Sequence, residues 1–263
     1  MSMKLSWIPN SLSLGKLFLG FISIILSSIA SSSPNHYGLY VYSTISILVA
    51  AVLDVLDGRI ARKINQNNPM GKELDSLADL ITFGLAPGFM FFTMLFGPHP
   101  YYQDSPFSSF PMSGYVIGGI IAFIFPLTGA LRLAKFNVTE SKGFFIGIPS
   151  PIAGGTCAII LSFSDLPVLF DSIISIPHIP LLPWWGALTI FVFYSVLMIS
   201  KFIFPKTPPT FMDFSKSNTI YKNLLSGLFL AALIVFFKYF LLVYTVYYTF
   251  VPIFTFKRKT RPS

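Results

Sequence analysis

The chain is poor in charged residues and in cysteine. Only 11% of its 263 residues are charged, whereas an ordinary soluble domain has about 25%. Its mean hydropathy is +0.71, so a soluble globular protein is excluded and an integral membrane protein is indicated. The single cysteine, Cys157, excludes an intramolecular disulfide and gives no sign of an oxidising compartment. Because Cys157 lies in an apolar stretch, we expect a buried and chemically inert thiol.

Apolar residues make up 54% of the chain and fall into long runs. A helix needs roughly 20 apolar residues to cross a bilayer core of about 30 Å. Six runs approach or reach this length, at residues 14–30, 39–56, 74–96, 115–133, 149–163 and 185–203. We therefore predict an all-α, polytopic transmembrane helix bundle with six core spans, built as one domain over residues 1–263.

The last apolar stretch, residues 219–256, is too long for one span. As a single helix it would measure about 57 Å, nearly twice the thickness of the bilayer core. One or two further C-terminal spans are therefore expected. The basic tail that follows the stretch favours two, because it would then lie on the same side as the other basic residues.

The lysines and arginines of the first 222 residues fall on one side of the six-span arrangement. They are Lys4, Lys16, Arg59, Arg62, Lys63, Lys72, Arg132, Lys135, Lys142, Lys201, Lys206, Lys216 and Lys222. Because short loops rich in Lys and Arg stay in the cytoplasm, we predict that this side is cytoplasmic. The net charge of +8 then reflects topology, and nucleic acid is not expected as a partner. A cleaved secretory signal is the alternative for the first run, but its removal would destroy this alternation.

One polar segment interrupts the apolar pattern between the second and third predicted spans. It reads Asp54-x-x-Asp57-Gly58-x-x-Ala61-Arg62, eight residues, then Gly71-x-x-x-Asp75-x-x-x-Asp79. On a helix the first group falls within an arc of roughly 140° and the second within about 80°. A polar turn with three asparagines and a proline separates the groups and lets two helices return antiparallel. We predict that the two acidic stripes face each other.

Four aspartates in spanning helices need a physical reason. On insertion scales they cost about 10 to 14 kcal/mol. Two divalent cations would cancel the four charges, and carboxylate oxygens suit Mg²⁺ or Mn²⁺ better than zinc. Arg62 is the only cation on the same stripes, so metal ions explain the cluster better than ion pairs do. We predict a metal site formed by Asp54, Asp57, Asp75 and Asp79, which handles a charged phosphate substrate.

The spacing of this segment, with every fixed position present, resembles the signature of the CDP-alcohol phosphatidyltransferases. The resemblance implies transfer of a phosphatidyl group from CDP-diacylglycerol to an alcohol, with release of CMP, by metal-assisted attack of the alcohol hydroxyl. It implies that Asp54, Asp57 and Asp75 ligate metal and that Asp79 both ligates metal and acts as the base. The CDP moiety is expected beside the small and basic positions of the segment, which are Gly58, Ala61, Arg62 and Gly71.

Further segments resemble the members of that family that use L-serine as acceptor and make phosphatidylserine. They lie within about the first 155 residues and are Ile8-Pro9-Asn10 with Leu14 and Gly20, Asp75 to Asp79 followed by Thr82 to Pro87, Arg132 to Asn137, and Gly147 to Pro151. Candidates for contacts with a lipid phosphate or the acceptor are Arg132, Lys135 and Thr82. For Arg132 the alternative is a side chain that extends toward the headgroups. Lys16 stands where asparagine is usual, and we expect it to lie away from the aspartates.

Two alternatives stay open on the sequence alone. The acceptor could be glycerol 3-phosphate or an inositol phosphate, although a dianionic phosphate should need additional basic residues. A transporter coupled to ions or protons would use the aspartates as a transport path, but such groups usually lie near the midplane beside discontinuous helices. The resemblance implies CDP-diacylglycerol, L-serine and membrane lipids as partners. The sequence leaves open a homodimer and the choice between Mg²⁺ and Mn²⁺.

Overall fold

The helices of the computed structural model follow the apolar runs of the sequence. It describes residues 7–63, 69–102, 105–109, 112–138, 144–162, 182–205, 243–244, 246–250 and 252–253. The elements are α1 (Trp7–Ala30), η1 (Pro34–His36), α2 (Leu39–Lys63), α3 (Pro69–Asp79), η2 (Leu80–Leu85), α4 (Ala86–Phe96), η3 (Pro106–Ser109), α5 (Met112–Val138), β1 (Phe144–Ile146), α6 (Ser150–Leu161), α7 (Trp184–Ile199) and β2 (Ile203–Pro205). Of the short elements, η1 and η3 are 3₁₀ turns and η2 is a π-helical segment.

Among the described residues, four helical stretches are long and apolar enough to cross a membrane: Asn10–Ala30, Pro34–Ile60, Pro69–Phe96 and Gly114–Val138. Two shorter apolar helices, α6 and α7, coincide with the fifth and sixth predicted runs. The predicted all-α, polytopic architecture is confirmed. The last of these helices ends at Ile199, before the predicted boundary, because the chain leaves the helix at Ser200 and enters β2. The predicted C-terminal spans lie largely outside the described residues.

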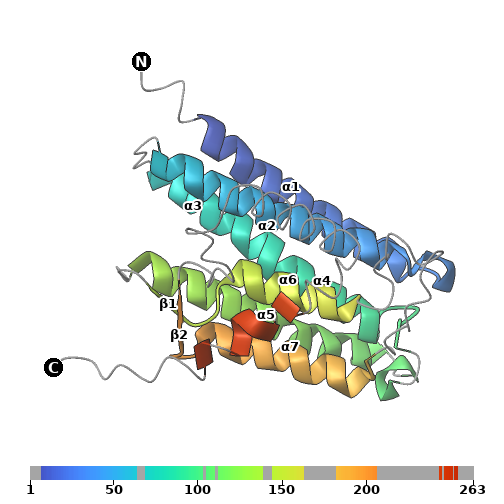
Figure 1. Ribbon diagram of the computed structural model, residues 1–263. Coiled ribbons are helices and arrows are strands. Elements are labelled where there is room, and N and C mark those ends of the chain that lie inside the picture. The colour runs from blue at the N-terminus through green and yellow to red at the C-terminus, as the bar shows by residue number, and fades with distance from the viewer. Residues whose placement is uncertain are drawn as a thin grey trace, which may run out of the picture.

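The helices α1 and α2 lie side by side along most of their length (Figure 1). Their interface carries hydroxyl groups: Ser43 Oγ lies 2.7 Å from Ser23 Oγ and 2.8 Å from Ser27 Oγ. Small hydroxyl side chains let helices approach closely and satisfy one another's hydrogen bonds in an apolar medium. α1 also packs against α3 and η2. It therefore contacts both helices that carry the acidic stripes.

A continuous helical rod runs through α3, η2 and α4, with the π segment in its middle. Two neighbouring helices reach the backbone of that segment at glycines. A Cβ on Gly20 of α1 would lie 2.6 Å from Thr82 Oγ1, and a Cβ on Gly154 of α6 would lie 2.5 Å from Phe83 O. π segments inside α-helices are rare and frequently occur at functional sites. Here the segment begins directly after Asp79.

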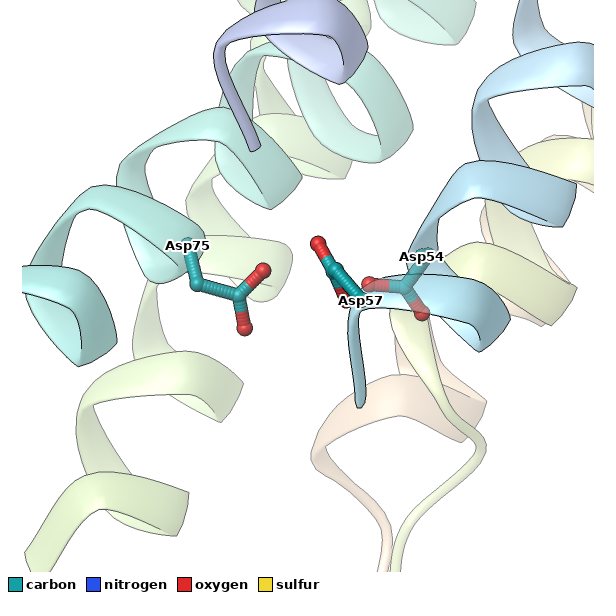
Figure 2. A group of neighbouring side chains, drawn as sticks. All are labelled: Asp54, Asp57 and Asp75. Carbon is teal, nitrogen blue, oxygen red and sulfur yellow. The ribbon is translucent and has the colours of Figure 1, made fainter. Parts of the chain in front are cut away.

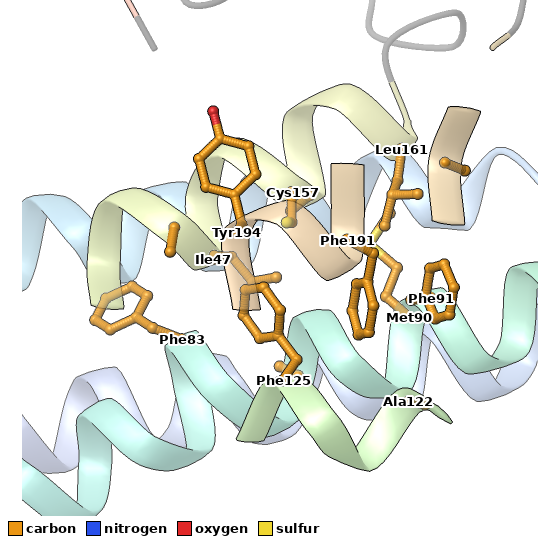
Figure 3. Packing of buried hydrophobic residues seen from close by; sticks show 14 of the residues in the cluster. Ile47, Phe83, Met90, Phe91, Ala122, Phe125, Cys157, Leu161, Phe191 and Tyr194 are labelled. Carbon is orange, nitrogen blue, oxygen red and sulfur yellow. The ribbon is translucent and has the colours of Figure 1, made fainter. Parts of the chain in front are cut away.

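Aromatic side chains fill the space between α4, α5 and α7 (Figure 3). The rings of Phe91 and Phe191 stack with centroids 3.8 Å apart, and Phe125 stacks on Phe191 at 5.0 Å. Cys157 of α6 lies in the same buried cluster and carries a free thiol, as predicted. Burial of these large apolar surfaces and their dispersion contacts hold the helices together.

The segment after α5 pairs with the segment after α7 in a two-stranded antiparallel sheet, in which Phe145 lies opposite Phe204. These strands were not predicted, because three residues are too few to show a pattern of period two. Figure 1 shows the sheet near the end of the bundle where α3 begins and α5 ends. The sheet therefore borders the part of the bundle that carries the polar segment.

Candidate active site

Two helices bring three of the aspartates together. Asp54 and Asp57 lie three residues apart on α2, and Asp75 lies on α3. A carboxylate oxygen from each lies within 4.8 Å of one from each of the others. Figure 2 shows the side chains of the two helices pointing toward one another. The predicted meeting of the acidic stripes is confirmed, and this group could hold a metal ion.

The side chain of Lys16 enters the cluster from α1. Its Nζ lies 2.7 Å from Asp54 Oδ1, 3.1 Å from Asp57 Oδ2 and 3.0 Å from Asp79 Oδ1, and it also contacts Asp75 Oδ1. The Lys16 side chain is fully buried. The expectation that Lys16 lies away from the aspartates is therefore wrong. The cluster contains an internal cation, and a third helix completes the site.

The donors of α1 are divided among all four carboxylates. A lysine ammonium has three N–H groups, and those of Lys16 are donated to Asp54, Asp75 and Asp79. Asp57 also accepts a hydrogen bond from the hydroxyl of Ser13, at 3.4 Å. Ser13 precedes Lys16 by three residues, so both side chains leave α1 on the same face. This face of α1 is matched to the acidic stripes.

The backbone of α1 is held in place beside the π segment. Thr82 is fully buried, and its hydroxyl donates a hydrogen bond to the carbonyl oxygen of Lys16 at 2.9 Å. The close approach at Gly20, one turn later, presses the same face of α1 against Thr82. This geometry favours a structural role for Thr82 in place of the predicted contact with a lipid phosphate or the acceptor. Thr82 fixes the turn of helix from which Lys16 extends.

The cluster keeps an excess of negative charge. When all five groups are ionised, the four carboxylates and the single ammonium leave a formal net charge of −3. The side chains of Asp57 and Asp79 are 7% and 12% exposed, whereas those of Asp54 and Asp75 are 23% and 42% exposed. Buried charge of one sign is costly unless it is compensated. Carboxylate oxygens are hard ligands, so the residues present fit a divalent cation that approaches from the side of Asp54 and Asp75.

The residues expected to bind the CDP moiety lie next to this cluster along the chain. Gly58 follows Asp57 directly on α2, and Ala61 and Arg62 belong to the last turn of that helix. Gly71 lies in the first turn of α3, four residues before Asp75. The side chains of Ala61 and Arg62 lie outside the described residues. The binding of the CDP moiety by these four positions stays a prediction.

A second polar feature lies at the end of α5. A pocket of ≈ 390 Å³ is lined by Arg132 and Lys135 of α5, Ile146 of β1, and residues at the end of α7. Arg132 is only 8% exposed, so it does not extend toward the headgroups. Its Nη1 donates a hydrogen bond to Ser150 Oγ at 3.0 Å, while its Nε has no hydrogen-bond partner among the described residues. A buried donor of this kind is suited to an anionic ligand.

The pocket and the acidic helix are linked through α5. Asn137 Nδ2 donates a hydrogen bond to Ser76 Oγ at 3.1 Å, and Ser76 directly follows Asp75 on α3. Neither this contact nor the membership of Lys16 and Ser13 in the site was predicted from the sequence. A signal for Lys16 was present, because a lysine inside a predicted span needs an anionic partner.

Comparison with known proteins assigns the chain to a class. A sequence model of the family described as CDP-alcohol phosphatidyltransferase matches residues 6–174. The match covers all the residues of the acidic cluster, together with Lys16 and Arg132. The chain therefore belongs to the CDP-alcohol phosphatidyltransferase family, a family of enzymes that transfer a phosphatidyl group to an alcohol.

Three individual relatives of the chain share a more specific name. A Bacillus subtilis protein is 34% identical over 166 residues, which are 63% of this chain and 80% of that protein. A Helicobacter pylori protein is 30% identical over 252 residues, or 88% of this chain and 94% of the relative. A Methanocaldococcus jannaschii protein is 32% identical over 166 residues, or 62% and 63% of the two chains. Each of the three is named CDP-diacylglycerol–serine O-phosphatidyltransferase.

Proposed function

We propose that this enzyme transfers the phosphatidyl group of CDP-diacylglycerol to L-serine, giving phosphatidylserine and CMP with the help of Mg²⁺ or Mn²⁺. The observation that carries the proposal is the cluster of four carboxylates between α2 and α3. Serine as the acceptor is supported by the names of the three relatives. The whole chain is proposed to act as one domain.

In the proposed site, Asp54, Asp57 and Asp75 hold the divalent cation, because they offer oxygen ligands close together. A divalent cation held by these residues would supply Lewis-acid polarisation of the diphosphate and positive charge beside the departing CMP. Asp79, the last residue of α3, is almost fully buried and adds a fourth negative charge to the site.

Asp79 is the proposed general base. It accepts the proton of the serine hydroxyl as the hydroxyl oxygen forms a bond to the phosphorus that bears diacylglycerol. The bond from that phosphorus to the bridging oxygen breaks, and CMP leaves with the electron pair. A carboxylate is suited to this role because serine is a weak acid whose proton must be removed as it attacks. Among the described residues, His36 lies before the start of α2 and His99 lies after the end of α4, beside Ser31, so both are far from the cluster.

The pocket at the end of α5 is the proposed place for the anionic group of the acceptor or of the lipid. Arg132 presents a buried guanidinium there, and Lys135 adds an exposed ammonium at the same pocket. A guanidinium binds a carboxylate with two parallel hydrogen bonds, whereas an ammonium acts as a point charge. We therefore assign Arg132 the larger share of the binding energy. The basic residues at this end of the bundle support an active site at the cytoplasmic leaflet.

The test is CMP release by the purified full-length protein supplied with CDP-diacylglycerol and a panel of acceptors. We expect release with L-serine that exceeds release with glycerol 3-phosphate or inositol 1-phosphate by at least about tenfold, the size of one lost charge-assisted hydrogen bond. Chelation by EDTA should abolish release, and Mg²⁺ or Mn²⁺ should restore it. Asp57→Asn serves as the control for background hydrolysis. Equal release with and without serine would contradict the proposed acceptor, and release in EDTA would contradict the proposed metal.

A further inference from the structure

Lys16 makes four contacts that one metal ion of a pair would otherwise make. Its Nζ touches one oxygen of each of the four carboxylates. A divalent ion binds such oxygens at about 2.1 Å, so the same four oxygens cannot ligate an ion while the ammonium nitrogen remains among them. Each carboxylate has a second oxygen that Lys16 does not use. Those second oxygens are the ones that remain as ligands for a cation.

The position of Lys16 is fixed on several sides. Its three N–H groups are all donated to aspartates, its side chain is fully buried, and its carbonyl oxygen accepts the Thr82 hydroxyl. To leave the cluster, the ammonium would have to give up its hydrogen bonds to the three aspartates inside an apolar bundle. Transfer of a charged side chain away from its partners in such surroundings is strongly unfavourable. The ammonium is therefore a resident part of the cluster.

Charge balance points to the same conclusion. The cluster has a formal charge of −3 with Lys16 in place. With Lys16 in place, one divalent cation would change the formal charge of the cluster to −1 and two would change it to +1. Two ions would bring the four carboxylates to zero only if the ammonium left the cluster. The lysine therefore supplies part of the positive charge for which four carboxylates alone would need a second ion.

We propose that Lys16 takes the place of one of two metal ions, so that this enzyme binds a single divalent cation and uses its own ammonium as the second positive centre. The inference rests on the proposed function in one respect, the binding of a divalent cation by the aspartates. Beyond the proposed function, the inference sets the number of bound divalent ions at one and gives Lys16 of α1 a positioning role. Lys16 also keeps the aspartates together when no metal is bound.

The experiment counts Mn²⁺ ions bound per chain by electron paramagnetic resonance of the purified full-length protein. We expect one ion for the natural chain and two for Lys16→Asn, which removes the ammonium and opens its space. Lys72→Asn is the matched control, because Lys72 is an exposed lysine of α3 that lies outside the cluster, and it should bind one ion. Two ions in the natural chain, or equal numbers in the natural chain and in Lys16→Asn, would overturn the proposal.

A second measurement covers the case in which the variant folds poorly. Thermal unfolding in EDTA should occur at least about 5 °C lower for Lys16→Asn and Lys16→Gln than for Lys72→Asn, because the four aspartates then repel one another without compensation. Mn²⁺ should remove that difference. Unfolding temperatures in EDTA that match between the Lys16 variants and Lys72→Asn would contradict the role of the ammonium. Neither readout involves serine, so loss of the serine reaction alone would refute the proposed function and leave this inference standing.

Discussion

The aromatic core between α4, α5 and α7 and the acidic cluster between α1, α2 and α3 are built on opposite principles. In the core, Phe91, Phe125 and Phe191 gain from burial alone, and their rings stack without any need for a charged partner. In the cluster, burial of each carboxylate costs free energy that only a cation can offset. The core stabilises the bundle, whereas the cluster uses part of that stability to hold charges close together. Substitutions in the two regions should therefore affect different measurements.

The largest effect is expected for Asp79→Asn. The amide cannot accept the proton of the attacking hydroxyl, so CMP release with serine should fall by at least about 10³-fold, within the range for loss of a general base and its charge. The unfolding temperature should change little or rise, because one of four mutually repelling charges is lost. Glu73→Gln, at an exposed position of the same helix, is the matched control. Activity near that of the natural chain in Asp79→Asn would remove this residue as the base.

Phe191→Ala should have the converse effect. Deletion of a ring that stacks on both Phe91 and Phe125 leaves a cavity, which costs about 3–5 kcal/mol of unfolding free energy. At a temperature where the variant remains folded, its kcat should stay within about twofold of the natural value, because α1, α2 and α3 hold the cluster on their own contacts. Thermal unfolding and CMP release, measured on the same sample, check both parts. A large loss of kcat in the folded variant would show that the two regions are coupled.

Arg132→Ala should affect substrate binding more than chemistry. Loss of a buried guanidinium from the pocket removes a charge-assisted hydrogen bond of about 1.5–3 kcal/mol, so the KM for serine or for CDP-diacylglycerol should rise about 10- to 100-fold. The substrate whose KM rises identifies the anionic group that the pocket binds. Lys201→Ala, at an exposed lysine just after α7, controls for general loss of positive charge. An unchanged KM for both substrates would exclude the pocket as a binding site.

The smallest effect is expected for Thr82→Val, which keeps the shape of the side chain and removes its hydroxyl. The lost hydrogen bond to the Lys16 carbonyl should cost about 1 kcal/mol, or about 2–4 °C in unfolding temperature for a chain of this size. If Thr82 is structural, the KM values should not change. An increase in KM with no change in the unfolding temperature would restore the originally predicted contact with substrate.

The helices and the acidic stripes could be predicted from local patterns in the sequence, whereas the position of Lys16 could not. Hydrophobic runs predict helices because a bilayer accepts little else, and the spacing of Asp54, Asp57 and Asp75 places them on two stripes by helix geometry alone. Lys16 could not be placed by spacing, since it lies 38 residues before Asp54 in the chain and its position depends on how α1 packs. Long-range packing of this kind has no local pattern. The contact between Asn137 and Ser76 and the pairing of β1 with β2 could not be predicted for the same reason.

The π segment has a consequence for how one rod serves both regions. Relative to a regular α-helix, an extra residue in a turn rotates everything that follows by about 100°. The face of α4 that carries Phe91 is therefore rotated by that angle, relative to the face of α3 that carries Asp75, from where an uninterrupted helix would place it. Removal of one residue from Leu80–Leu85 would restore an ordinary helical phase. The rod could then present either its acids or its aromatic rings in the right direction, but not both.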